Sequence, residues 1–407
     1  MPTALGWGER ATLLVRPALR TATALFPGLI GRTARPLVEG MPDRPRNPAA
    51  AAHVWVDELV LAMFELVQEP PTQADWERIA FEVDEAVPLY RRQGWVDDPA
   101  SYHDQPAAPD ASPVALRVWN RRIEQLSFRS GWEPKAGEPG AVRWLSQMEN
   151  RDAYVWLLRH PGGQPRPWIV AVHGTGFGRP DGDMWALRAE HLHRELGANI
   201  AMPVMPLHGR RRPPGSPRGA MVPTPDVLDN VHALAQATWD VRRLIAWIRM
   251  QEPTAIGITG MSLGGHIAAM VASLESLDCV VAGIPVVDFP GVFRRAMRTV
   301  DGGPGLHRPY QALGDGPDLL HRIVNPLCLE PETDPSRRFI YAGLHDRMAY
   351  APEQAARLFE HWGQPETHWY AGGHLAQLAN RGITQFVSRA FAKSGVSTGR
   401  VVGAPRG

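Results

Sequence analysis

The second half of the chain repeats one pattern, in which short apolar runs alternate with longer segments whose apolar residues recur at helical spacing. Runs this short and this apolar are typical of strands buried in a parallel sheet. We expect strands at 168–172, 199–206, 255–259, 279–287, 338–343 and 366–370, helices at 181–196, 265–272 and 352–362, and a long helix that starts at 224–226. Strands that alternate with helices predict an α/β fold, a mostly parallel central sheet with helices on both faces.

The first 136 residues do not show this alternation of apolar runs and helical segments. Apolar residues recur at helical spacing over 52–68, 73–93 and 113–128, whereas 40–50 and 97–112 are rich in Pro and are expected to be loops. We therefore predict a mostly helical N-terminal extension over 1–136, an α/β domain over 137–393 and a flexible tail over 394–407. The α/β domain is expected to open with a hairpin of two strands at 141–146 and 153–159.

The turn after the expected strand at 255–259 carries a candidate nucleophile. It reads G-M-S-L-G over 260–264, a G-x-S-x-G pattern followed directly by the helix at 265–272. A serine on such a sharp turn has a strained backbone and an exposed Oγ, and the flanking glycines avoid collisions with the neighbouring strand and helix. The context predicts that Ser262 is a nucleophile, which needs an adjacent base because a serine hydroxyl is weakly nucleophilic.

Two later strands end in side chains that suit the partners of this serine. Asp346 follows the strand at 338–343, and His374 follows the strand at 366–370 in the sequence A-G-G-H. The carboxyl ends of parallel strands share one rim, where ligands bind, so we expect both side chains near the serine. Asp288, after the strand at 279–287, is the alternative acid, and Asp346 taken alone also suits a helix cap.

The loop after the strand at 168–172 suits an oxyanion hole. It reads H-G-T-G-F-G over 173–178, and its glycines let backbone N–H groups approach a developing oxyanion without side-chain obstruction. We expect the N–H of Leu263 to be one donor and the second to come from Gly174, Thr175 or Gly176.

Taken in order, the serine turn, the His-Gly loop, the late Asp and the Gly-Gly-His resemble the α/β-hydrolase family over about 137–393. The resemblance implies that Ser262 is the nucleophile, that His374 is the general base and then acid, and that Asp346 orients the histidine. The loop departs from the His-Gly-Gly-Gly of many lipases, which leaves the second oxyanion donor open. The sequence around these motifs is similar to that of actinobacterial α/β-hydrolase-domain proteins with a helical N-terminal extension. This resemblance does not indicate a substrate.

Two further loops are expected to shape a pocket at this rim. The loop at 207–214 is basic, and an arginine fork can bind a carboxylate or a phosphate, although a solvated basic loop is an equal alternative. Its candidate substrate-binding residues are His208, Arg210, Arg211 and Arg212. The insertion at about 289–337 lies between two core strands, and its helical segments and glycines suit a cap over the pocket.

Composition narrows the function classes. The 407 residues carry 43 basic and 42 acidic side chains, a net charge of +1, so no global field favours nucleic acid. The two cysteines, Cys279 and Cys328, support neither a disulfide framework nor a zinc site. We predict no metal and no cofactor.

The N-terminal stretch is apolar but interrupted. Arginines and prolines within 11–31 argue against a transmembrane helix and a signal peptide, and we expect a cytoplasmic protein. Residues 10–35 are basic with little acid, which suits weak contact with a membrane surface. The favoured alternative is that this stretch packs on its own domain, and the oligomeric state is not defined by any of these patterns.

Together these features predict a serine hydrolase of the carboxylesterase or lipase type, which acts on a small-molecule ester or acyl substrate through a Ser-His-Asp triad and an acyl-enzyme. A peptidase and an acyltransferase are alternatives on the same fold. A non-catalytic binding protein on a hydrolase scaffold is a third alternative, which the intact set of Ser, His and Asp disfavours.

Overall fold

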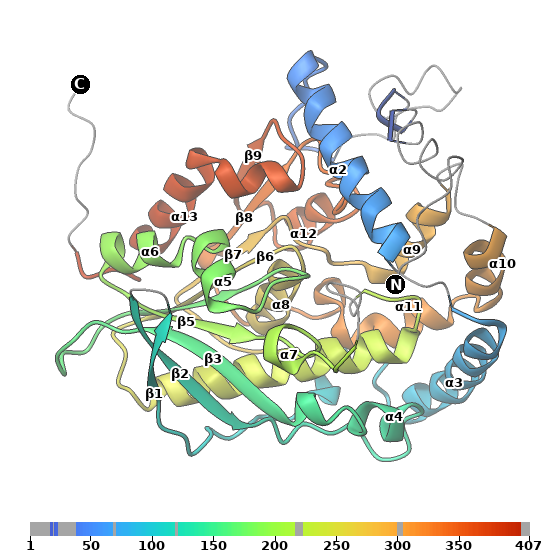
Figure 1. Cartoon of the computed structure of the whole chain (residues 1–407), viewed down its shortest axis with the longest axis horizontal. Coiled ribbons are helices and arrows are strands. Elements are labelled where there is room, and N and C mark those ends of the chain that lie inside the picture. The colour runs from blue at the N-terminus through green and yellow to red at the C-terminus, as the bar shows by residue number, and fades with distance from the viewer. Residues whose placement is uncertain are drawn as a thin grey trace.

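A nine-stranded sheet forms the centre of the molecule, with helices on both faces (Figure 1). The computed structural model describes residues 17–18, 20–22, 38–67, 71–118, 121–215, 223–298 and 304–399. The strand order is β1-β2-β3-β5-β4-β6-β7-β8-β9, antiparallel from β1 to β5 and parallel from β5 to β9. The predicted α/β fold with a mostly parallel sheet is therefore confirmed.

The strands are β1 (Val114–Val118), β2 (Arg121–Arg129), β3 (Asp152–Leu158), β4 (Trp168–Val172), β5 (Asn199–Val204), β6 (Ile256–Met261), β7 (Cys279–Gly283), β8 (Arg338–Gly343) and β9 (Glu366–Tyr370). The strands β4, β8 and β9 have the predicted bounds, whereas β5 ends at Val204 rather than at 206, β6 covers 256–261 rather than 255–259, and β7 ends at Gly283 rather than at 287. Every residue of β4, β6, β7 and β8 is buried, as expected for strands covered on both faces.

The longer helices are α2 (Pro48–Val67), α3 (Gln73–Arg92), α7 (Val227–Arg249), α8 (Leu263–Ala272) and α13 (Arg381–Lys393). The shorter helices are α4 (Ala141–Leu145), α5 (Pro180–Ala186), α6 (Ala189–Leu196), α9 (Phe289–Arg298), α10 (Pro304–Ala312), α11 (Gly316–His321) and α12 (Ala355–His361). The helices predicted over 52–68 and 73–93 are confirmed as α2 and α3.

Two apolar cores lie on opposite faces of the sheet, because successive side chains of a strand point to opposite sides. In β4, Val170 and Val172 belong to the core that holds the buried residues of α7 and α8. Ile169 and Ala171 belong to the other core, with residues of α6 and α13. The sheet is thus held between two helical layers.

The segment 113–128 corrects two predictions. It forms β1 and β2 rather than a helix, so the predicted extension supplies two strands of the sheet. The residues at 141–146 form α4, and β3 pairs with β2 instead of with a strand there. Ile123, Leu126 and Phe128 are spaced in a way that suits either element, and the decision comes from pairing with β3, which local spacing does not reveal.

Several predicted helices have different bounds in the structure. The helix expected at 352–362 is the shorter α12, Ala355–His361. The helix expected at 181–196 is split into α5 and α6, because Arg188 adopts a left-handed backbone with φ of 57°. The long helix expected to start at 224–226 is α7, which begins at Val227 and is capped by Asp226, whose side chain accepts a hydrogen bond from the Asp229 N–H. Thr224 and Asp226 are both good N-cap residue types, so sequence alone does not decide between these starts.

The predicted tail is docked where the structure describes it. Val396 is fully buried, and the Thr398 N–H donates to the carbonyl of Leu196 at the end of α6. The flexible tail predicted over 394–407 is therefore wrong for 394–399, and 400–407 lie outside the described residues. The insertion predicted over 289–337 contains α9, α10, α11 and short turns of 3-10 helix; its role as a cap stays a prediction.

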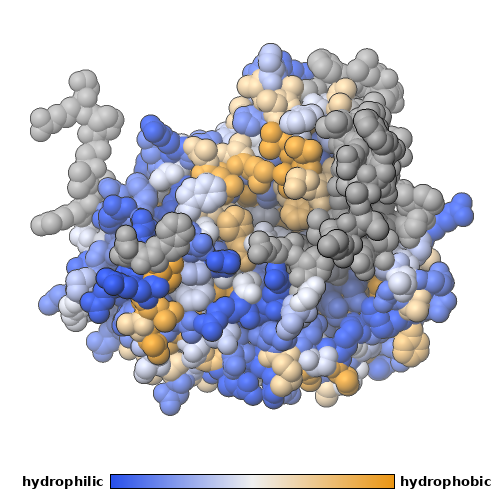
Figure 2. All heavy atoms as spheres, in the orientation of Figure 1, coloured by the Kyte–Doolittle hydropathy of each residue, from blue (hydrophilic) through white to orange (hydrophobic). Residues whose placement is uncertain are grey.

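Helix α2 is apolar on several sides. Val54 is buried, whereas Val56 and Met63 are exposed, and apolar side chains gather in the upper half of Figure 2, where α2 lies in Figure 1. Within the part of the chain that the structure describes, no helix is long and apolar enough to cross a membrane. Of residues 10–35, predicted to touch a membrane surface, only 17–18 and 20–22 are described.

Candidate functional site

Ser262 occupies a strained turn between β6 and α8. Its φ of 56° and ψ of −116° lie in a region that residues with a side chain rarely adopt. A Cβ on Gly260 would collide with the backbone of Gly264, and one on Gly264 would collide with the carbonyl of Val172. The glycines therefore permit the close packing that holds Ser262 at the carboxyl end of β6.

His374 and Asp346 are joined by a hydrogen bond. The Nδ1 of His374 lies 2.7 Å from Oδ2 of Asp346, and both side chains are buried. The other carboxylate oxygen, Oδ1, accepts hydrogen bonds from the N–H groups of Met348 and Ala349, which fixes its direction. An ionised carboxylate only accepts, so Nδ1 carries the proton and Nε2 is the basic nitrogen of the neutral ring.

These residues share one rim of the sheet with Ser262. Ser262 follows β6, Asp346 follows β8 and His374 follows β9, and these strands run parallel. The short helix η8 (Leu375–Ala379), which begins after His374, returns to the serine turn, where Gln377 Nε2 lies 3.1 Å from Met261 Sδ.

Asp288 has other partners. Its Oδ1 accepts a hydrogen bond from the Gly291 N–H in the first turn of α9, and its Oδ2 lies 2.6 Å from Arg357. It thus sits at the start of α9 and pairs with a cation, whereas Asp346 is the acid hydrogen-bonded to His374. This arrangement favours Asp346 over Asp288 as the acid that orients the histidine.

A second carboxylate, which sequence reasoning missed, lies beside the histidine. Asp57 of α2 accepts a hydrogen bond of 2.7 Å from the backbone N–H of His374 and is almost fully buried. Burial disfavours the charged imidazole, but Asp346, with Asp57 as a smaller contributor, outweighs it and raises the pKa of His374. The available signal was the pair of adjacent acids, Asp57 and Glu58, within an otherwise apolar helical segment.

The predicted oxyanion loop packs against the serine turn. A Cβ placed on Gly174 would lie 3.5 Å from the Cβ of Ser262, so this backbone lies next to the candidate nucleophile. His173 fixes the loop from below: Nδ1 donates to the Gly174 carbonyl at 2.8 Å, and Nε2 accepts from the Met205 N–H. Burial lowers the pKa of His173 to about 3, which keeps the ring neutral. Leu263 starts α8, where first-turn N–H groups lack intrahelical acceptors.

Asp183 of α5 is buried under the same loop. Its Oδ1 accepts a hydrogen bond of 2.9 Å from the Gly178 N–H, whereas Oδ2 has no hydrogen-bond partner within the described ranges. Burial, with a smaller contribution from Asp181, raises the pKa of Asp183 to about 7. The glycine loop is therefore anchored by a carboxyl group that keeps its proton in mildly acidic solution.

We expect Asp183→Asn to stabilise the protein at alkaline pH. The ordinary pKa of this carboxyl is 3.8; hence, as pH rises toward 7, the unfolded chain binds fewer protons than the folded one and stability falls. An amide keeps the acceptor for Gly178, carries no charge and removes this loss, which is roughly 4 kcal/mol in all, with about 2.5–3 kcal/mol of it between pH 5 and pH 8. Urea unfolding at about pH 5 and about pH 8 measures the difference. Asp181→Asn is the control, and a pH slope in Asp183→Asn equal to that of wild type would contradict the assignment.

The arginine loop is only partly available for substrate. Arg211 is fully buried and bonds Asp240 Oδ2 at 2.8 Å together with two backbone carbonyls. Arg210 bonds Gln125 and lies over the ring of Tyr154, on the outer strands. The prediction that Arg211 binds substrate is therefore wrong, because a buried arginine needs its carboxylate partner.

The other two residues of this loop differ from each other. His208 is buried with its Nδ1 2.8 Å from the carbonyl of Pro206, and burial lowers its pKa to about 4. It packs beside the ring of His173 and so supports the oxyanion loop from within. Arg212 is partly exposed, and its role in substrate binding stays a prediction.

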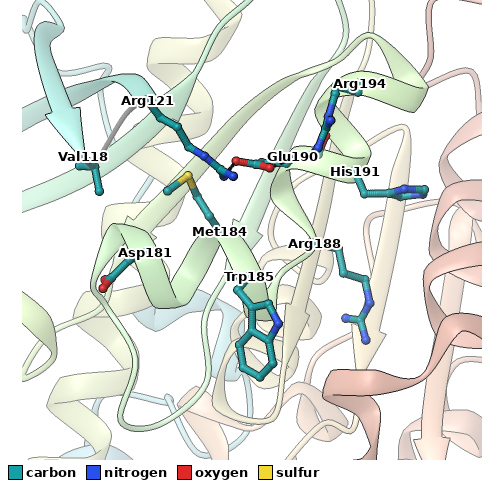
Figure 3. Close-up of a pocket in the computed structure, with 9 residues that line it drawn as sticks. All are labelled: Val118, Arg121, Asp181, Met184, Trp185, Arg188, Glu190, His191 and Arg194. Carbon is teal, nitrogen blue, oxygen red and sulfur yellow. Dashed lines mark hydrogen bonds and ion pairs between the residues drawn. The ribbon is translucent and has the colours of Figure 1, made fainter.

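A pocket of about 480 Å³ lies apart from these residues, between β1 and the α5–α6 turn (Figure 3). Its arginines are already engaged: Arg121 and Arg194 both point to Glu190, and Arg188 bonds Thr384 and the Gln377 carbonyl. None of the candidate catalytic residues lines it. Among the described residues, no group of three or more His, Cys, Asp or Glu side chains is arranged to hold a metal ion.

Comparisons with known proteins identify the family. The sequence model described as "Alpha/beta hydrolase family" matches residues 169–404, more than half of the chain. The chain therefore belongs to the alpha/beta hydrolase family.

Individual relatives are similar to most of the chain. An uncharacterized protein of Mycobacterium tuberculosis strain CDC 1551 is 44% identical over 353 residues, which cover 86% of this chain and 83% of that protein. Its counterpart from strain H37Rv is 43% identical over the same coverage. Among solved structures, carboxyl esterase 2 of Tuber melanosporum is 16% identical, with a TM-score of 0.42, over 74% of this chain and 97% of that one.

Proposed function

We propose that the protein is a serine hydrolase of carboxylic esters, with Ser262 as nucleophile, His374 as general base and Asp346 as the acid that orients it. The observation that carries the proposal is the His374–Asp346 hydrogen bond on the rim where Ser262 is held in a strained turn. A triad is recognised by geometry and by the roles of its members, and Ser262, His374 and Asp346 are the side chains that would take these roles here. Its location at the carboxyl end of parallel strands is where ligands bind in open α/β sheets.

The proposed chemistry proceeds in two halves. Ser262 Oγ attacks the ester carbonyl while His374 Nε2 takes its proton, and the oxyanion is held by the Leu263 N–H and the 174–176 loop. His374 then gives the proton to the leaving alcohol, which departs and leaves the acyl group on Ser262. Water attacks the acyl-enzyme with His374 again as base, and the acid leaves with Ser262 restored. Asp346 keeps its negative charge throughout and stabilises the imidazolium that forms twice in each cycle.

A panel of p-nitrophenyl esters, from acetate to palmitate, beside aminoacyl-naphthylamides tests this function. We expect ester turnover with kcat on the order of 1–1000 s⁻¹ for the preferred chain length, and no amide cleavage. Amide cleavage with equal kcat/KM would make the protein a peptidase. Formation of a new ester from an added alcohol, in preference to the free acid, would make it an acyltransferase. Failure of every substrate would favour the non-catalytic alternative.

A further inference from the structure

Helix α2 contributes a side chain to the loops that carry the histidine and its acid partner. Asp57 Oδ2 accepts hydrogen bonds from the N–H of His374 at 2.7 Å and from the N–H of Arg347 at 3.0 Å. Its Oδ1 accepts a longer one, of 3.3 Å, from the N–H of Leu375. Arg347 follows Asp346 directly, so one carboxylate ties together the loop after β8 and the loop after β9.

The fit around Asp57 is tight. Asp57 is 1% exposed, and a Cβ placed on Gly373 would lie within 2.9 Å of all three atoms of its carboxylate. The glycine before His374 therefore makes room for the acid of α2. The neighbouring Glu58, also buried, bonds Arg347 Nε at 2.6 Å and pairs with Arg20 at 3.7 Å. Two adjacent acids thus anchor α2 on the loop after β8, and only Asp57 reaches the histidine loop.

We propose that Asp57 is a positioning residue of the active site, which holds the backbone of His374 in place and adds a second negative charge beside its ring. The expected effect of Asp57 on turnover rests on the proposed function. The hydrogen bonds of Asp57 do not, because they are part of the folded structure whether or not the protein is catalytic. The N-terminal segment that carries α2 is then a working part of the site rather than an appendage. Helix α2 also packs on η8, which continues from His374, and this contact agrees with that role.

The charged groups around Asp57 determine how loss of its carboxylate changes the pKa of His374. Asp346 and the Arg347 N–H lie beside it on the loop after β8, and His374 and Tyr370 on β9 and its loop. On the N-terminal side lies Glu58, whose charge is paired with Arg347 and Arg20. Burial, followed by the charge of Asp346, raises the pKa of Asp57 to about 6, against the opposing effect of His374. The ionised carboxylate in turn favours the imidazolium of His374. Loss of the Asp57 charge must therefore lower the pKa of His374.

The experiment compares Asp57→Asn with Asp57→Ala and with Glu58→Gln. Histidine side-chain NMR titration, with His374 assigned through His374→Gln, reads the electrostatic effect without any need for activity. We expect the His374 pKa in Asp57→Asn to fall by about 0.5–1, and the acid limb of kcat/KM against pH to move down by the same amount. In Asp57→Ala the buried N–H of His374 and the partly buried N–H groups of Arg347 and Leu375 lose their acceptor, so kcat should fall roughly 10- to 100-fold with little change in KM.

Glu58→Gln is the matched control, because it removes a buried acid one residue away that does not contact His374. It should lower the denaturant midpoint but leave the His374 titration and the acid limb in place. An unchanged His374 titration in Asp57→Asn, or an equal shift in Glu58→Gln, would overturn the proposal. If the titration shifts as expected while the wild type hydrolyses no ester, Asp57 keeps its positioning role and the proposed function fails separately.

Discussion

Replacing Ser262 with alanine should abolish covalent labelling by a fluorophosphonate probe and lower kcat by about 10⁴–10⁶. The probe reacts with a serine that an adjacent base activates, and the strained turn places Ser262 at the carboxyl end of β6, on the rim that also carries His374. The alanine side chain is smaller and meets the same backbone demand, so folding should be unaffected. Gel-based labelling and ester turnover of wild type and variant measure the two effects.

A matched control exists on the same helix. Ser273 caps the carboxyl end of α8 and donates its hydroxyl to the Ala269 carbonyl at 3.2 Å. Ser273→Ala should be labelled like wild type and should turn over ester normally. Equal labelling of Ser262→Ala would show that another serine carries the acyl group, and the nucleophile assignment would be abandoned.

Asp346→Asn should lower kcat by roughly 10⁴ while KM changes little. The carboxylate accepts the His374 Nδ1 proton at 2.7 Å, whereas an amide that turns its N–H₂ toward the ring favours the tautomer with the proton on Nε2. That tautomer has no basic nitrogen facing the serine. Steady-state kinetics over a range of pH separate this loss from a change in substrate affinity.

Asp288→Asn provides the comparison. Asp288 starts α9 and pairs with Arg357, so its amide should cost stability and leave most of the activity. If Asp288→Asn is the crippling change and Asp346→Asn keeps activity, the two roles must be exchanged.

The elements that carry the candidate site were predictable because their signals are local. The serine turn lies between an apolar run and a helix within a few residues, and β8 and β9 end within four residues of Asp346 and His374. Parallel strands then bring their ends to one rim without any knowledge of side-chain contacts. The same reasoning gave the sheet from β4 to β9 and the two N-terminal helices.

The predictions that were wrong or left open depend on contacts between residues far apart in the sequence. The residues of β1 and β2 form strands because β3 offers an edge to pair with. The Arg211 side chain points into the protein because it pairs there with the buried Asp240 of α7. The direction in which a loop side chain points cannot be predicted from the neighbouring sequence. Asp57 looks like a solvated charge on a helix until the loop after β9 is folded against it.

The bond between Asp57 and the His374 loop also sets an order of assembly. Its two ends are 317 residues apart in sequence, so at typical synthesis rates α2 leaves the ribosome roughly 15–60 s before the histidine does. Throughout that interval Asp57 lacks the backbone N–H groups of His374 and Leu375 as hydrogen-bond donors. Under the proposed function, a nascent chain is thus expected to hydrolyse no ester until the loop after β9 has folded onto α2.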